Sequence, residues 1–269
     1  MKFMKKYGIL FVLSLTSIFA KANIQNDIVP ERWSDIKDHT DGILKSFFVG
    51  VEYRVKAGIA VGGTSPLPVP LEIQEIKSFK PSLNISLEAE IVKTFSQYWG
   101  LSFGLRLETK GMETDARVKT YQLRMLSPDG GEVEGAFTGF VKTRVANSYI
   151  SLPALAMWKP SERWEIKLGP YVSYLYSGDF SGSAYGGYLR EGSPIGPKLE
   201  IPEAKYEFAE NLRRWNWGAQ LGADWRAFPH LLVGIDLTWG MNSIFKKNFE
   251  VMTFDMYPIF LNLNFGYAF

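Results

Sequence analysis

The sequence contains no cysteine and only two histidines among its 269 residues. The absence of cysteine excludes disulfides and thiolate metal sites, even though an oxidising compartment would permit disulfide bridges. After residue 22 no run approaches the roughly 18 consecutive apolar residues that suggest a membrane-spanning helix. We therefore expect no membrane-spanning helix after residue 22.

The charge balance changes once the N-terminus is set aside. The chain carries 30 Lys+Arg and 28 Asp+Glu, but four lysines and no acidic residue lie in residues 1–22. The remaining chain thus has 26 basic and 28 acidic residues, a formal charge of −2 (26 − 28). This balance gives no reason to expect nucleic-acid binding.

Residues 1–22 have the order of a secretory signal peptide. Three early lysines precede the apolar segment Tyr7–Phe19, and Ala20-Lys21-Ala22 supplies the small residues of a cleavage site. The alternative is a membrane anchor, but the apolar segment contains three hydroxyl residues and falls short of the roughly 20 residues that a spanning helix needs. We expect cleavage after Ala22, followed by a periplasmic N-terminal segment at 23–46 that is either a short helix or an ordered tail.

Eight later segments alternate apolar and polar residues with a period of two, as strands with one apolar face do. The fourth is the least regular, because Pro153 cannot donate a hydrogen bond to a neighbouring strand. The segments are 47–58, 83–91, 99–108, 145–158, 164–176, 215–225, 231–241 and 257–269.

The connections between these segments alternate in length. Short connections, rich in turn-forming residues, lie at 94–98, 159–163 and 227–230. Long connections lie at about 60–81, 111–144, 177–211 and 242–253; within them 119–142 reads as a hairpin extension with its tip at 127–131, and 177–211 reads as irregular. Outer-membrane barrels combine short periplasmic turns with longer extracellular loops. The sequence therefore predicts an all-β fold over 47–269: an eight-stranded antiparallel transmembrane up-and-down β-barrel in the outer membrane, with both termini periplasmic.

The polar face of the segments is rich in glycine and in charges of both signs. An eight-stranded barrel has an interior just wide enough for side chains to fill, so this face fits the inside. The alternative is the solvated face of a soluble, lipocalin-like barrel, which would not be expected to carry so many glycines. The polar face includes Glu165, Lys167 and Asp236. The charged residues that we expect to form an interior network are Glu52, Arg54, Lys56, Glu88, Glu90, Arg106, Glu108, Asp224 and Arg226.

Aromatic residues on the apolar face fall into two groups, as expected for side chains at the two membrane interfaces. One group lies beside the short turns and the other toward the long connections. The first comprises Trp99, Trp158, Trp164 and Trp225, and the second Trp215, Trp239 and Tyr257.

Several stretches resemble the PorT-type outer-membrane barrel proteins of the Bacteroidota. The stretch 147–158 followed by Leu168-Gly-Pro-Tyr-Val-Ser-Tyr-Leu175 is similar to a strand–turn–strand motif of that family, although Ser151 stands where the family usually has an acid. Residues 105–111 look like a second family motif. The last six residues resemble the signal read by the outer-membrane assembly machinery, which suggests a C-terminal assembly signal of Phe265, Tyr267 and Phe269. The resemblance implies a barrel. It suggests a role in secretion as one of several roles that the family includes.

Catalytic chemistry finds little support in the sequence. Outer-membrane hydrolases and acyltransferases resemble one another in using a histidine near the outer rim, whereas His39 precedes the first strand and His230 falls in a predicted periplasmic turn. The acidic pairs on the strands are most simply interior ion pairs, and no metal-ligand spacing stands out. We therefore expect a non-enzymatic binding, assembly or secretion-associated (PorT-like) component without cofactor or metal.

The alternatives are a narrow passive pore, a surface adhesin-type barrel or a surface enzyme. The expected partners are outer-membrane lipid and lipopolysaccharide, the assembly machinery, and a secretion-system or envelope protein, with no nucleic acid.

Overall fold

The computed structural model describes residues 50–126, 132–191, 196–249, 251 and 254–269. Gly50–Phe269 forms one compact unit, which we call the second unit because residues 1–49 precede it in the chain. The expected signal peptide, the segment 23–46, the start of the first strand, His39 and the hairpin tip at 127–131 lie outside the described residues.

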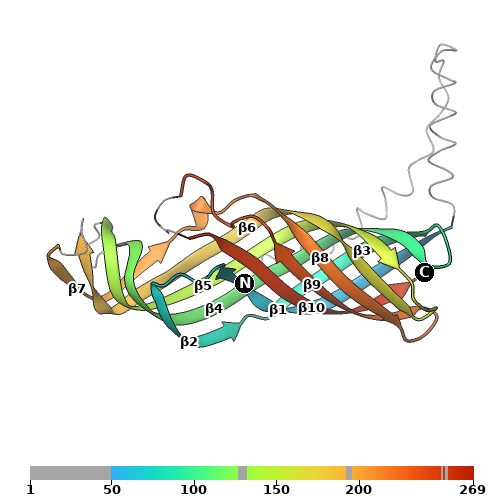
Figure 1. Cartoon of the computed structure of the whole chain (residues 1–269), viewed down its shortest axis with the longest axis horizontal. Coiled ribbons are helices and arrows are strands. Elements are labelled where there is room, and N and C mark those ends of the chain that lie inside the picture. The colour runs from blue at the N-terminus through green and yellow to red at the C-terminus, as the bar shows by residue number, and fades with distance from the viewer. Residues whose placement is uncertain (1–49, 127–131, 192–195, 250, 252–253) are drawn as a thin grey trace, which may run out of the picture. The chain divides into compact units, whose positions relative to one another are not determined.

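Eight antiparallel strands form a closed ring in the second unit, as the alternating pattern predicts (Figure 1). Each strand pairs with its neighbour in the ring, and the last strand pairs with the first over thirteen residues, from Arg54↔Ala268 to Pro66↔Met256. The ring strands, in order, are β1 (Val51–Pro66), β3 (Asn84–Thr94), β4 (Trp99–Leu126), β5 (Glu132–Trp158), β6 (Trp164–Glu191), β8 (Trp215–Arg226), β9 (Leu231–Gly240) and β10 (Met256–Ala268).

The three short turns lie at one end of the ring, together with the beginning of β1 and the end of β10. We call this the turn end and the opposite one the loop end. The two strand termini are tied together at the turn end, where the Phe269 N–H donates to the Tyr53 carbonyl at 2.9 Å. The His230 ring contacts the same region, with its Nδ1 2.8 Å from the Ala268 carbonyl oxygen.

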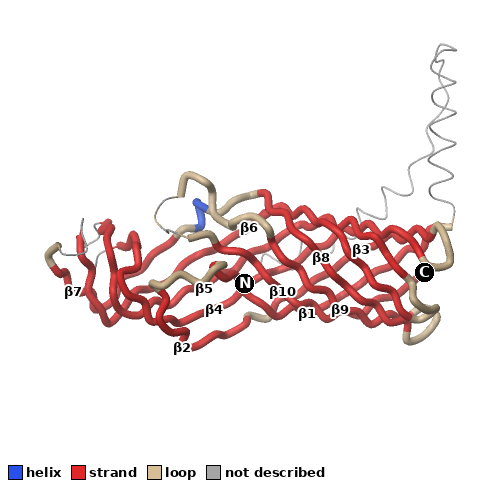
Figure 2. Tube along the Cα trace, viewed as in Figure 1, coloured by secondary structure: helices blue, strands red, loops and turns tan. Residues whose placement is uncertain are grey.

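Three ring strands, β4, β5 and β6, continue far beyond the loop end and form an extension with two further strands (Figure 2). We define the extension as residues 73–81, 111–126, 132–146, 177–191 and 198–207. The expected hairpin at 119–142 is present in its described part, since β4 and β5 stay paired to Leu126↔Glu132. Within the residues that the structure describes, no helix is long and apolar enough to span a membrane.

Two further predicted loops, besides 111–144, contain strand, and the expectation that 177–211 is irregular is wrong. There β6 continues to Glu191, β7 (Lys198–Glu207) pairs with it, and a single 3-10 turn, η1 (Ala209–Asn211), follows. In the connection at 60–81, β1 continues to Pro66 and β2 (Ile73–Pro81) pairs with β4. Backbone pairing with a long neighbour holds these Gly- and Ser-rich or highly polar residues extended.

Pro153 is accommodated inside the barrel by a glycine on the adjacent strand. The β4–β5 ladder is interrupted opposite Pro153, where no hydrogen bond from its nitrogen is needed. A Cβ added to Gly104 would lie 2.9 Å from Pro153 Cγ, so the proline ring packs against bare backbone. Pro153 itself is buried on the inner face and faces Tyr171 of β6.

Candidate functional site in the barrel interior

The structure brings the nine charged residues of the expected network to the inside of the barrel. Seven of them are buried, while Glu52 and Arg226 lie at the turn-end rim and are partly exposed. The opposite face of the same strands carries exposed apolar side chains, among them Val55, Leu105 and Leu263. A period of two separates the two sets, so the inner face is polar and the outer face can meet lipid.

The layer nearest the turn end is dominated by an ion pair across the barrel. The Arg54 guanidinium donates two hydrogen bonds to the Glu165 carboxylate, at 2.6 and 2.9 Å. Strands β1 and β6 are four steps apart in either direction around the ring, so this pair spans the full diameter. Arg226 donates to both oxygens of Glu52 at 2.8 and 3.0 Å and closes the rim.

The next layer contains two lysines and two carboxylates. Lys56 Nζ lies 3.0 Å from Glu90 Oε2 and 2.7 Å from Asp224 Oδ2. Lys167 Nζ lies 2.6 Å from the same Asp224 oxygen and also pairs with Glu90. The four side chains come from β1, β3, β6 and β8, so the layer links strands that are not neighbours in the ring.

A third layer surrounds Arg106 of β4. Its guanidinium pairs with Glu88 at 2.7 Å and approaches Asp236 of β9, the strand opposite β4, at 3.6 Å. The amides of Gln220 and Asn264 donate to the two oxygens of Asp236 at 3.2 and 2.7 Å. This layer therefore mixes ion pairs with neutral hydrogen-bond donors.

Lys110 marks the transition from the charged interior to an apolar one. Its ammonium pairs with Glu108 at 2.9 Å and faces the rings of Tyr149, Tyr171 and Phe260 at 5.2 to 5.8 Å from their centroids. Cation–π attraction of this kind holds a charge beside aromatic carbon. Lys110 was not among the expected network residues, although it continues the even-numbered inner face of β4 and could have been found from that parity.

Apolar side chains fill the barrel beyond Lys110 toward the loop end. Aromatic rings pack against one another there, with Phe180 and Phe245 4.9 Å apart and Phe208 and Phe249 5.0 Å apart between centroids. Loop residues join strand residues in this cluster, because Ile244 and Phe245 come from the connection between β9 and β10. The interior thus contains two stacked cores, one ionic and one apolar.

The charges of the ionic core are balanced. Among the described residues, seven carboxylates and seven cations take part in its ion pairs. Buried charges are tolerated only when they are paired in this way. The carboxylates belong to Glu52, Glu88, Glu90, Glu108, Glu165, Asp224 and Asp236, and the cations to Arg54, Lys56, Arg106, Lys110, Lys159, Lys167 and Arg226.

Glycines leave room for this core. A Cβ at Gly234 would lie 2.1 Å from Asp224 Oδ1 and 2.5 Å from Asn264 Oδ1, and one at Gly222 would lie 2.3 Å from Asp236 Oδ1. No ordinary side chain could occupy these positions without displacing an acidic or amide group. The glycines of the inner face are therefore a packing requirement of the charged layers.

The extension presents polar side chains beyond the apolar band. Tyr185 donates to the Asp115 carboxylate at 2.7 Å, and this hydrogen bond raises the pKa of the Tyr185 phenol. A polar groove of about 570 Å³ lies where the β4–β5 hairpin meets the segment after β7, and its lining includes Arg124, Glu134 and Glu210. Among the described residues, no group of three histidine or acidic side chains is arranged to hold a metal ion.

Comparison with known proteins gives a family match over most of the barrel. Residues 41–246 match the family model described as outer membrane protein beta-barrel domain. No curated protein sequence matches the chain. The crystal structure of Ail, the attachment invasion locus protein of Yersinia pestis, in complex with the heparin analogue sucrose octasulfate, is 12% identical, with 81% of this chain and 99% of Ail covered and a TM-score of 0.37. Neisserial surface protein A (NspA) is 11% identical, with 82% and 97% covered and a TM-score of 0.34.

Proposed function

Because the chain belongs to the outer membrane protein beta-barrel domain family, we propose that it is a non-enzymatic binding protein of the outer membrane. In this proposal the barrel is a closed support, and the extension presents the binding surface. The partner is a secretion-system or other envelope protein, which would make the chain PorT-like in role. An adhesin would use the same surface.

The observation that carries the proposal is the filled interior. A pore needs a continuous water path, whereas the Arg54–Glu165 pair spans the diameter and the aromatic cluster around Phe180 occupies the loop end. Eight strands leave an interior just wide enough for side chains to fill, so no wide channel runs through it. The buried charges form ion pairs with one another, which supports a structural role for them and argues against both conduction and catalysis.

The extension supports a binding role by its size and its chemistry. β4 and β6 have 28 residues each, about three times the roughly 9–11 that cross a bilayer. Ordering this many residues costs conformational entropy. Crossing the bilayer does not require them, whereas presenting a surface to a partner does. The polar groove lined by Arg124, Glu134 and Glu210 offers charges of both signs to a hydrophilic protein partner.

We further propose that the turn end faces the periplasm and the extension faces the medium. The turn end has connections of four or five residues, and the opposite end has long extended strands. Outer-membrane barrels typically have short turns on the periplasmic side and longer segments on the extracellular side. In this orientation Phe265, Tyr267 and Phe269 are available to the periplasmic assembly machinery. The exposed apolar band contacts outer-membrane lipid and lipopolysaccharide.

Cysteine labelling tests this orientation against a clean background, because the chain has no cysteine. Lys142→Cys introduces a thiol in the extension, and the matched control Ser161→Cys introduces one in a short turn; both positions are exposed. With a membrane-impermeant maleimide on intact cells, we expect labelling at position 142 alone, and at 161 only after the outer membrane is permeabilised. Labelling at 161 but not 142 in intact cells would reverse the orientation and remove the extension from the cell surface.

A further inference from the structure

The barrel wall has a gap between β1 and β2. The pairing of β1 with β3 ends at Ala60↔Asn84, yet β1 continues to Pro66 along β10. From Asn84 toward the loop end, β2 pairs with β4 in place of β3, from Pro81↔Met112 to Ile73↔Val118. Among the described strands, β1 pairs only with β3 and β10, so its edge beyond Ala60 faces β2 without a hydrogen-bonded ladder.

Side chains close the lower margin of this gap in place of backbone pairing. The Asn84 amide accepts a hydrogen bond from the Gly111 N–H at 2.6 Å and donates to the carbonyls of Gly111 and Ala60 at 3.1 and 3.4 Å. Further along β1, the Thr64 N–H donates to the sulfur of Met112 at 3.2 Å. A thioether is a weak acceptor, so this part of the β1 edge is held less firmly than a paired strand.

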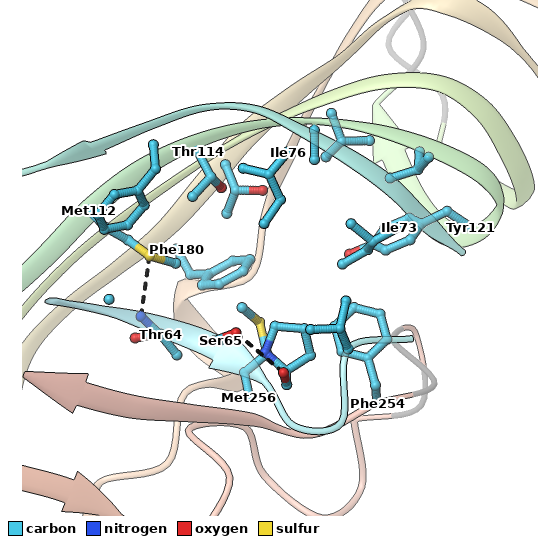
Figure 3. A pocket seen from close by; sticks show the side chains of 18 of the residues that line it. Thr64, Ser65, Ile73, Ile76, Met112, Thr114, Tyr121, Phe180, Phe254 and Met256 are labelled. Carbon is cyan, nitrogen blue, oxygen red and sulfur yellow. Dashed lines mark hydrogen bonds between the residues drawn. The ribbon is translucent and has the colours of Figure 1, made fainter. Parts of the chain in front are cut away.

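Behind the gap lies an apolar cavity of about 270 Å³ (Figure 3). Thr64 and Ser65 lie on its β1 side, and Thr114 and Ile76 lie on the opposite side in the close-up view. The buried ring of Phe180 and the thioether of Met112 also line it. None of its described lining residues is charged, so the cavity suits a hydrocarbon.

The apolar surface of the barrel continues to the mouth of this cavity. Val61 and Leu83, the residues beside the last β1–β3 pair, are 54% and 81% exposed. On the rim, Ile76 and Phe79 of β2 are 61% and 47% exposed, and Leu71 in the β1–β2 connection is 95% exposed. Apolar side chains so exposed are typical of contact with lipid. The mouth therefore opens where the lipid-facing band meets the loop end.

The size of the cavity fits part of a lipid chain. A protein cavity of roughly 150 Å³ lined by apolar side chains binds benzene, with its six carbons, so about 270 Å³ gives room for roughly ten carbons. The side chains of Phe79 and Met112 close the gap beside Gly63. A Cβ added to Gly63 would lie 3.1 Å from Phe79 and 2.8 Å from Met112. The gap can admit an acyl chain because both side chains can rotate away.

We propose that the gap between β1 and β2 is a lateral entry through which one acyl chain of a membrane lipid inserts from the bilayer into the apolar cavity. The bilayer is the source, because the mouth is continuous with the lipid-facing surface and its described lining offers no charge for a water-borne anion. The proposal requires only that the barrel lies in a membrane. It does not depend on which end faces the medium or on the partner of the extension.

Photocrosslinking tests the proposal on the full chain reconstituted in phosphatidylcholine vesicles. A small fraction of the lipid carries a ten-carbon acyl chain that ends in a diazirine, and mass spectrometry maps the labelled residues after illumination. We expect adducts on outward residues such as Leu105 and Leu263, and also on the inward residues Met112 and Phe180. Adducts confined to the outward residues would overturn the proposal. This arm uses the unsubstituted protein, so its outcome does not depend on whether a variant folds.

A filled variant supplies the second arm. Gly63→Leu with Ala116→Phe places bulk at the mouth and in the cavity, and is expected to remove the inward adducts while the outward ones remain. The matched control is Ala223→Phe, which adds the same ring on the lipid-facing side of β8; it should keep both sets. Inward adducts that persist in the filled variant would show that the label does not enter through this gap, and would also overturn the proposal. Folding of each variant is checked by its gel mobility with and without heating.

Discussion

Arg54 and Glu165 form a bidentate ion pair across the whole diameter of the barrel, with donor–acceptor distances of 2.6 and 2.9 Å. Both side chains are almost completely buried. Such a pair holds two opposite walls of the ring at a fixed separation. It also removes the space that a water-filled channel would need at this level.

Breaking this pair from one side should destabilise the barrel strongly. Arg54→Met leaves the Glu165 carboxylate buried without its main partner, a change that typically costs about 3–5 kcal/mol. The double variant Arg54→Met with Glu165→Met should recover part of that loss, because the buried Glu165 carboxylate is removed together with its main partner. The measurement is the free energy of unfolding in urea, with the protein in lipid vesicles.

The control for that experiment is an ion pair in the extension. Arg124 and Glu134 lie 2.9 Å apart, with side chains 47% and 54% exposed. Because exposed pairs contribute little, Arg124→Met should change the free energy of unfolding by less than about 1 kcal/mol. Equal effects of the two substitutions would contradict a stabilising role for the pair across the barrel.

Gly234 should tolerate no side chain. A Cβ there would meet Asp224 and Asn264 at 2.1 and 2.5 Å, so Gly234→Leu must displace buried polar groups. We expect a large loss of the heat-sensitive fast-migrating form on gels. Ala223→Leu on the lipid-facing side of the neighbouring β8 should fold normally. Normal folding of Gly234→Leu would show that the ionic core is loosely packed.

The alternating pattern made the ring of eight strands predictable. Lipid on one side and a charged core on the other impose opposite chemistry on successive residues, as in 99–108 and 257–269. The same pattern placed Glu88 and Arg106 on the inner face. The pattern could not predict which residues Glu88 and Arg106 contact across the barrel. Those contacts depend on the tilt and stagger of the strands, which cannot be read from the alternation in a single sequence.

The pattern failed beyond the membrane for a physical reason. Residues 177–191 are rich in Gly and Ser and read as a loop, but they pair with β5 along their backbone. Outside the bilayer the outward face contacts water, so its residues need not be apolar and the alternation fades. Only the inward residues Phe180, Ala184 and Leu189 keep an apolar character there. β7 escaped prediction for the same reason.

The C-terminal aromatic residue should act in assembly more than in stability. Phe269 is exposed and stacks edge-on against Tyr267, at 5.0 Å between ring centroids. Phe269→Ser should therefore reduce the amount of barrel inserted into the outer membrane of cells while leaving folding into vesicles in vitro nearly unchanged. A parallel loss in both settings would assign the residue a purely structural role.

Single-channel recording in planar bilayers tests most directly whether the barrel is a closed support. The two stacked cores predict that the purified protein, inserted and verified as folded by its heat-sensitive gel mobility, gives no steady open levels at any applied voltage that the bilayer withstands. Reproducible conductance steps of uniform size from the folded protein would contradict this and show that the chain forms a pore.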